Sequence, residues 1–253
     1  MSLFSSKPDY EPLPLDELKV QTAPVSGADI SAVYFEQREG GDFYDFLRVG
    51  PSRLLFGMLD VSGNHEENQP ILSMAKEKFE SRGKELFSGD SVNEATAITT
   101  LLLELNRAIL DTAGRVHSCP AFAGCYNEEL GTVCYGNAGH TPGLIFDGKE
   151  ISELKATGLP LGLFSLATID APTVALPSGA VLLLVSRGMV EAQCGENEFG
   201  LEGAESTLKR AFPADARTLL TSIMEDVQNF TCKAPSQNDV TALALVRQNG
   251  SKP

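Results

Sequence analysis

Two short acidic segments contain the residues best suited to chemistry. GGDFYD at residues 40–45 opens one strand-like run, and DVSG at residues 60–63 closes a later one. Carboxylates fixed by short strands, beside glycines that allow close backbone approach, are ligands that Mg²⁺ or Mn²⁺ prefers. These segments therefore predict a divalent-cation site that includes Asp42 and Asp60. Alternatively, both aspartates only form turns, which is common for aspartate beside glycine.

The net charge of the chain argues against several classes of function. With 20 basic and 34 acidic side chains among 253 residues, the net charge is -14 at pH 7. Binding to nucleic acid or to an anionic membrane surface needs clustered basic residues, and the sequence has no long basic run. The longest apolar stretch, residues 180–185, is far shorter than the roughly 20 residues of a membrane helix. We expect a cytoplasmic protein that binds neither nucleic acid nor a membrane.

The hydrophobic pattern predicts strands in hairpins and helices in pairs. The chain first has strand-like runs at residues 30–35, 43–49 and 53–61. Helical periodicity follows at residues 70–86 and 93–113. Two hairpins then follow, at residues 121–136 and 143–154. After them come a buried strand at 180–185, two helices at 201–230 that are broken near Pro213, and a last strand at 240–247. This order favours an α+β domain with antiparallel sheets over a parallel sheet.

The first residues and the cysteines give two further expectations. Residues 1–27, where prolines and glycines occur among polar residues, are expected to form an extended arm before a single domain at residues 28–253. The cysteines are odd in number and lack CxxC spacing, so we expect reduced packing thiols rather than a disulfide framework or a zinc site. They are Cys119, Cys125, Cys134, Cys194 and Cys232.

Six motifs occur in the order and spacing of the PPM metal-dependent serine/threonine phosphatases. They are GGDFYD (40–45), LLFGMLDVSG (54–63), YGNAGHTPGLIF (135–146), TGLPLGLF (157–164), LLLVSRGMVEA (182–192) and QNDVTALALVR (237–247). The chain most resembles the bacterial branch that includes sporulation stage II protein E and the sigma-factor-regulating phosphatases, over about residues 28–247. An ordered set of motifs is far more specific than any one motif.

This resemblance implies a fold and a reaction. The fold is a four-layer α-β-β-α sandwich in which helix pairs flank two antiparallel sheets. In that family two Mn or Mg ions at one end of the sheets activate a water molecule that attacks phosphoserine or phosphothreonine. By the resemblance, Asp42 binds the first ion, Asp60 bridges both ions, and Val61 adds its backbone carbonyl. Asp45 matches a further acid of the opening motif. The substrate is expected to be a phosphorylated regulatory protein, for example an anti-sigma-factor antagonist.

Two of the family's ligand positions are altered in this sequence. Arg187 replaces the aspartate of Ser-Asp-Gly, and Asn238 replaces the first of two C-terminal aspartates, which leaves Asp239. Both changes affect the same ion. At about 4 Å and an effective dielectric constant near 20, one unit of side-chain charge changes its interaction energy with the ion by about 4 kcal/mol per unit charge on the ion. A tenfold change in affinity corresponds to only roughly 1.4 kcal/mol. We therefore expect one Mn or Mg ion rather than two.

Arg187 has three interpretations. It is a strand-end arginine in water, a guanidinium that holds a phosphate or a carboxylate, or a cation that neutralises nearby aspartates. The loop after DVSG also departs from the family, which has His-Gly there. Its residues either supply replacement ligands or form a solvated loop before a helix at residue 70. They are Asn64, His65, Glu66 and Glu67. His140, in the third motif, is expected to be structural.

Three functions are compatible with these observations. The first is a phosphatase-fold protein that acts on a phosphoserine or phosphothreonine regulatory protein through a partly degenerate metal site, with weak or lost catalysis. The second is a fully active Mn- or Mg-dependent phosphatase that uses substitute ligands. The third is a non-catalytic subunit that binds partners. The two altered ligand positions favour the first.

Overall fold

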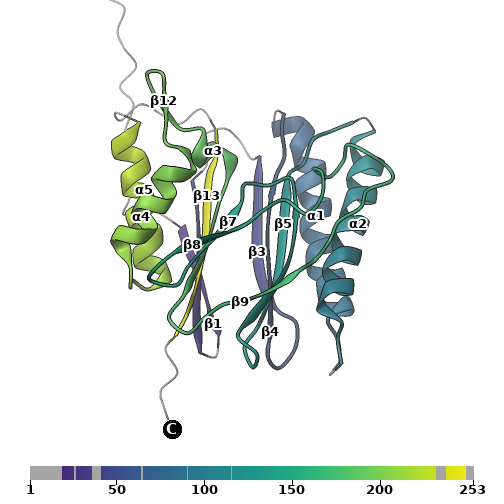
Figure 1. The fold of residues 1–253 in the computed structure, drawn as a ribbon. Helices are drawn as coiled ribbons and strands as arrows, with labels where there is room; N and C mark the ends of the chain where they lie inside the picture. The colour runs from purple at the N-terminus through teal and green to yellow at the C-terminus, as the bar shows by residue number, and fades with distance from the viewer. Residues whose placement is uncertain are drawn as a thin grey trace, which may run out of the picture.

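The structure, a computed structural model, describes residues 19–25, 27–35, 41–63, 65–89, 91–114, 116–231 and 238–248. Two antiparallel sheets face each other, and a pair of long helices covers the outer face of each sheet (Figure 1). The expected α+β class, with a helix–sheet–sheet–helix order of layers, is confirmed.

The two large sheets are built almost entirely from antiparallel neighbours. The six-stranded sheet has the order β1 (Lys19–Val25), β2 (Ala28–Phe35), β13 (Val240–Arg247), β10 (Val181–Val185), β7 (Gly143–Phe146) and β8 (Ile151–Leu154). The five-stranded sheet has the order β3 (Asp42–Arg48), β4 (Arg53–Asp60), β5 (Ala121–Asn127), β6 (Thr132–Ala138) and β9 (Thr173–Ala175). A small hairpin, β11 (Gln193–Cys194) and β12 (Asn197–Glu198), stands apart from both sheets.

The helices form the two outer layers. They are α1 (His65–Leu86), α2 (Glu94–Ala113), the single turn α3 (Arg187–Val190), α4 (Gly200–Ala211) and α5 (Ala216–Phe230). Helix α2 illustrates why they form, because its apolar residues at helical spacing are buried on one face. The side chain of Asn93 accepts a hydrogen bond from Thr96 N at 2.9 Å at its start, and Gly114 ends it with a φ of 62°.

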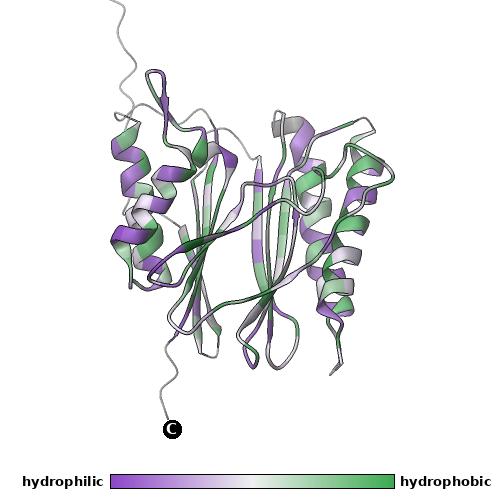
Figure 2. Cartoon of the chain, viewed as in Figure 1, coloured by the Kyte–Doolittle hydropathy of each residue, from purple (hydrophilic) through white to green (hydrophobic). Residues whose placement is uncertain are grey.

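Three hydrophobic clusters hold the layers together. One joins α1 and α2 to the five-stranded sheet, one joins α4 and α5 to the six-stranded sheet, and the third lies between the sheets. Figure 2 shows strands that are mainly hydrophobic and helices that carry hydrophilic as well as hydrophobic residues. Such amphipathic helices are expected where one side packs on a sheet and the other meets water.

Four details differ from the sequence analysis or add to it. Strand β1 pairs with β2 along residues 19–25, so the sheet includes part of the segment expected to be an arm. Helix α1 begins at His65 and contains Pro70, which we had expected near its start. Strand β9 and the β11–β12 hairpin were not predicted. None of the helices that the structure describes is long and apolar enough to cross a membrane.

The cysteine prediction was right for three residues and wrong for one. Cys119, Cys125 and Cys134 are free and buried, and burial raises the pKa of the Cys119 thiol to about 12. Such thiols are unreactive near neutral pH, because the reactive species is the thiolate. Cys194, however, is disulfide-bonded. Cys232 lies outside the described residues.

Candidate metal and phosphate site

Strand pairing brings the two predicted aspartates together. Asp42 is the first residue of β3, Asp60 is the last of β4, and the two lie directly opposite each other in the antiparallel register. Residues opposite each other in such a pair have Cβ atoms roughly 4.5–5.5 Å apart and share one face of the sheet. Neighbouring inward residues of β4 belong to the cluster between the sheets. Both carboxylates therefore sit at one end of the inter-sheet space, where β3 begins and β4 ends.

The other sheet contributes Asp239, just before β13. Its Oδ2 accepts a hydrogen bond from the backbone N–H of Gly41 at 2.6 Å and a longer one from the Tyr34 hydroxyl at 3.4 Å. A Cβ on Gly41 would lie 3.2 Å from the Val61 carbonyl oxygen, which is a tight contact, and 3.5 Å from Asp239 Oδ2, which is an ordinary one. Asp239 thus joins the starts of β3 and β13. Asn238, beside it, is exposed.

Asp42 is held by hydroxyl groups of the six-stranded sheet. Thr241 Oγ1 donates to Asp42 Oδ2 at 2.6 Å, and Ser186 adds a second side-chain hydrogen bond. Burial raises the pKa of Asp42 well above its ordinary value, and the nearby charge of Asp60 raises it further, against the lowering effect of Thr241. Three aspartates in one partly buried place repel one another, and a cation relieves that repulsion.

One such cation is Arg187. It is the first residue of α3, and its Nε lies 3.4 Å from Asp60 Oδ2 and 3.8 Å from Glu191 Oε1. Burial raises the pKa of Asp60, and Arg187 is the largest opposing influence. The arginine therefore faces the candidate site rather than only solvent. Its side chain is 47% exposed, so a ligand can still reach it.

The carbonyl of Val61 already has a hydrogen-bond partner. The Nδ2 group of Asn68 donates to it at 3.0 Å, and Asn68 is buried in the first turns of α1. The sequence analysis missed Asn68, because it started the helix at residue 70. Because α1 begins before Pro70, Asn68 lies in its first turns, from where it reaches the Val61 carbonyl.

The site offers an incomplete set of metal ligands. Among the residues that the structure describes, no group of three or more histidine, cysteine, aspartate or glutamate side chains is placed to hold a metal ion. What the geometry presents is two facing aspartates, a third aspartate hydrogen-bonded to backbone, and a guanidinium beside Asp60. Such carboxylates attract a cation, and a guanidinium such as that of Arg187 attracts an anion.

The family of the chain follows from comparison with known proteins. The family model for stage II sporulation protein E matches residues 50–248. The chain belongs to this family. Phosphoserine phosphatase RsbU of Bacillus subtilis (strain 168) is 27% identical over 176 residues, which cover 68% of this chain and 49% of that protein. The chain thus spans about half the length of this curated relative.

Solved structures of PPM phosphatases share the fold. The RsbU and RsbW domains of a Mycobacterium tuberculosis protein have a TM-score of 0.70 at 24% identity, covering 89% of this chain and 63% of that one. The SiaA-PP2C domain of Pseudomonas aeruginosa has a TM-score of 0.70 at 17% identity, covering 86% and 85%. The phosphatase domain of SpoIIE from Bacillus subtilis has a TM-score of 0.67 at 17% identity, covering 92% and 65%. The expected resemblance to PPM phosphatases is confirmed.

Other residues matched to the SpoIIE family lie away from the paired aspartates. Asp45 is three residues beyond Asp42 on β3, hence on the opposite face of the sheet. Burial raises the pKa of its carboxyl group there, and Lys76 and Lys84 of α1 act against that rise. His140 is buried, and burial lowers its pKa to about 4, so its ring is neutral at pH 7.

The altered loop is described only in part. Glu67 is exposed at the start of α1. Asn64 lies outside the described residues, as do the side chains of His65 and Glu66. The prediction that these residues supply replacement ligands stays a prediction.

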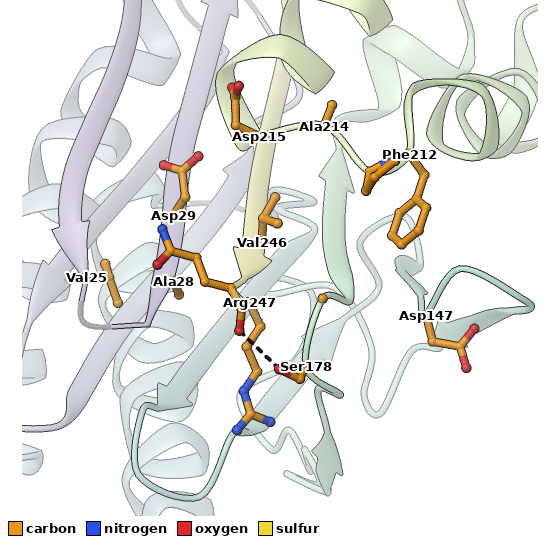
Figure 3. A pocket seen from close by; sticks show the side chains of 13 residues that line it. Val25, Ala28, Asp29, Asp147, Ser178, Phe212, Ala214, Asp215, Val246 and Arg247 are labelled. Carbon is orange, nitrogen blue, oxygen red and sulfur yellow. Dashed lines mark hydrogen bonds between the residues drawn. The ribbon is translucent and has the colours of Figure 1, made fainter. Parts of the chain in front are cut away.

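A separate pocket of about 710 Å³ lies at the other end of the sandwich, where β13 ends (Figure 3). Its charged groups have structural partners: Asp29 accepts from Ala216 N at 2.9 Å, Asp215 accepts from Thr218 N at 2.8 Å, and Arg247 donates to Leu176 O at 2.7 Å. None of the predicted site residues lines this pocket.

Proposed function

We propose that this chain binds a phosphoserine- or phosphothreonine-containing regulatory protein through a partly degenerate phosphatase site and hydrolyses the phosphate ester weakly or not at all. The observation that carries this proposal is the contact between Arg187 Nε and Asp60 Oδ2 at 3.4 Å. It places a permanent positive charge beside the aspartate that, by family resemblance, would bridge two ions. A second ion at that position would be repelled.

Arg187 also offers donors to a phosphate. The guanidinium has five N–H groups in a planar fork, and its described contacts are two ion pairs through Nε, with no hydrogen bond to a described residue. Both ion pairs are made through Nε, so among the described residues none accepts a hydrogen bond from the two terminal nitrogens. A phosphate monoester can accept two parallel hydrogen bonds from such a group.

One Mn or Mg ion at Asp42 and Asp60 belongs to the same proposal. The raised pKa of Asp42 reflects burial and the charge of Asp60, and an ion bound there would offset both. When bound, the ion would supply positive charge for the phosphate and would lower the pKa of a coordinated water. The residues of the chain would hold the phosphate with Arg187 and fix Asp42 with Thr241.

The class of partner is proposed from the relatives. RsbU is named a phosphoserine phosphatase, and it is 27% identical to this chain over 176 residues. We infer that the partner of this chain is likewise a phosphorylated regulatory protein, of the kind that acts in sigma-factor control.

The deciding experiment measures turnover and ion binding together. Hydrolysis of p-nitrophenyl phosphate and of a phosphoserine protein is followed with and without Mn²⁺, and the bound ions are counted by calorimetry. We expect at most one ion and a rate that is orders of magnitude below that of a two-ion phosphatase. Two ions with rapid turnover would contradict the proposal and favour a fully active enzyme with substitute ligands.

A further inference from the structure

One cysteine of the described chain is covalently paired. Cys194, in β11, is disulfide-bonded. The sequence has five cysteines, and Cys119, Cys125 and Cys134 are free and buried. The count of cysteines in the sequence therefore leaves Cys232 as the partner of Cys194.

The end of α5 packs on the base of the hairpin that carries Cys194. Phe199 directly follows β12, and its ring meets the ring of Phe230, the last residue of α5, edge to face with centroids 5.6 Å apart. Thr231 ends α5 and is buried, and Cys232 is the next residue in the sequence. This aromatic contact therefore brings together the two parts of the chain that carry the cysteines.

The β11–β12 hairpin directly continues α3, the turn that carries Arg187. Glu191 N donates to Arg187 O at 2.8 Å, and Phe199 N donates to Ala192 O at 2.8 Å, which closes the hairpin behind the turn. Figure 1 shows the hairpin, labelled β12, at the same end of the molecule as α3. Its two strands have two residues each and join neither large sheet. An isolated hairpin is at best marginally stable, so a covalent bond to another element would stabilise it.

The two cysteines also flank the two altered ligand positions in the sequence. Cys194 comes seven residues after Arg187, and Cys232 comes six residues before Asn238. A bond between them connects the segment that follows Arg187 with the segment that leads to Asp239. The bond would thus restrain both chain segments of the six-stranded half that contribute to the candidate site.

We propose that Cys194 and Cys232 form a redox-sensitive latch, whose disulfide holds the β11–β12 hairpin on α5 and keeps Arg187 beside Asp60, and whose reduction loosens α3 and weakens phosphate binding. A dithiol reduces the bond by thiol–disulfide exchange: the S–S bond breaks, each cysteine sulfur gains a hydrogen, and the two sulfurs of the reductant join in a new disulfide. Cys194 is half-buried between exposed neighbours, so a dithiol can reach it. The effect on phosphate binding rests on the proposed function, whereas the pairing and its hold on α3 do not.

Peptide mapping of the full chain tests the pairing. The protein is incubated with oxidised glutathione, alkylated without reductant and digested with trypsin. The lysines and arginines of the sequence predict fragments 188–209 and 218–233, each with one of the two cysteines. We expect mass spectrometry to find these fragments as one linked species that dithiothreitol separates. Fragments that are not linked to each other would overturn the proposal.

Hydrogen exchange and peptide binding test the latch. On reduction with dithiothreitol, the amides of residues 187–199 should exchange at least tenfold faster, because the turn and hairpin open more often. Residues 94–113 of α2 are the internal reference and should not change. Fluorescence anisotropy with a fluorescein-labelled phosphoserine peptide should show at least fivefold weaker binding to the reduced protein.

Variants separate the latch from other effects of the reductant. Cys194→Ser and Cys232→Ser should each behave like the reduced wild type and no longer respond to dithiothreitol. The matched control Cys134→Ala removes a free thiol and should keep the response, and circular dichroism checks that each variant is folded. Unchanged exchange of residues 187–199 on reduction, or unchanged peptide affinity despite faster exchange, would overturn the latch and leave the proposed phosphate binding intact. An oxidised wild type that binds no phosphoserine peptide would instead remove the proposed function, and peptide mapping and hydrogen exchange would still decide the pairing and its hold on α3.

Discussion

At the scale of single residues, Arg187 sets the chemistry of the site. A guanidinium cannot lose its charge at ordinary pH. The cation that Arg187 places beside Asp60 is therefore permanent, unlike a metal ion, which can dissociate. Burial raises the pKa of Asp60, and the arginine is the main influence against that rise. Under the proposed function, Arg187 supplies positive charge for an anionic ligand in place of the second ion, which would otherwise help to activate water.

Restoring both altered positions should restore the second ion. In the double variant Arg187→Asp and Asn238→Asp, the positive charge is removed and two carboxylates are added, so calorimetry should show one more Mn²⁺ bound than in the wild type. Hydrolysis of p-nitrophenyl phosphate should rise by about two orders of magnitude or more. Asn238→Asp alone is the control, because Arg187 remains, and it should gain neither. A double variant that binds a second ion yet stays inert would show that other catalytic parts are also missing.

His140 predicts how stability depends on pH. Its folded-state pKa is lowered to about 4 by burial, against about 6.5 for an exposed histidine. Between these values the unfolded chain binds a proton that the folded chain does not, so stability falls as pH drops from about 6.5 toward 4. From pH 7.5 to pH 5 this residue should cost the wild type about 2 kcal/mol. Urea unfolding of the wild type and of His140→Gln at both pH values measures it, and equal losses in the two proteins would refute the assignment.

At the scale of elements, the sequence predicted the strands and helices whose pattern is local. The apolar periodicity of residues 93–113 and the cap at Asn93 define α2 closely, and the break near Pro213 separates α4 from α5 as expected. The start of α1 was placed too late, because proline was taken as a first-turn residue. The structure instead includes Pro70 inside the helix.

The sequence predicted the site residues that belong to the motifs, but not the contacts between elements around them. The motifs predicted one cation site that includes Asp42 and Asp60, and the antiparallel register places these two residues opposite each other. That they bind an ion stays a prediction. The Asn68–Val61 contact depends on where α1 begins, and the choice among three roles for Arg187 depends on how α3 packs. Both are contacts between elements, and neither leaves a periodic signal in the sequence.

The packing of α3 makes Gly188 sensitive to substitution. A Cβ at Gly188 would lie 2.0 Å from the Asp239 backbone oxygen, so alanine must push α3 from β13. Gly188→Ala should cost about 1–3 kcal/mol, which lowers the melting temperature by roughly 2–4 °C per kcal/mol, and should weaken phosphopeptide binding by displacing Arg187. Gly50→Ala is the control, because its nearest neighbour would be 3.9 Å away. Similar melting temperatures for the two variants would contradict this account.

At the scale of the whole molecule, β13 connects the layers. Its alternate residues face in opposite directions, so that Leu243 and Leu245 belong to the cluster between the sheets, whereas Ala242 and Ala244 belong to the cluster under α4 and α5. The same strand begins one residue after Asp239. The candidate site therefore depends on packing on both faces of one strand, and damage to either core should disturb the whole.

Leu243→Ala tests this coupling. Leu243 is fully buried and lies opposite Leu184 of β10 and Ala32 of β2 in the sheet register. Truncation should lower the free energy of unfolding by about 2–5 kcal/mol. Urea unfolding, followed by circular dichroism and by tyrosine fluorescence since the chain has no tryptophan, should remain one transition in both signals. The exposed Leu130→Ala should change stability by less than about 0.5 kcal/mol. Two separate transitions in Leu243→Ala would mean that the helix–sheet halves fold independently, because loss of the central core would then leave each half able to unfold alone.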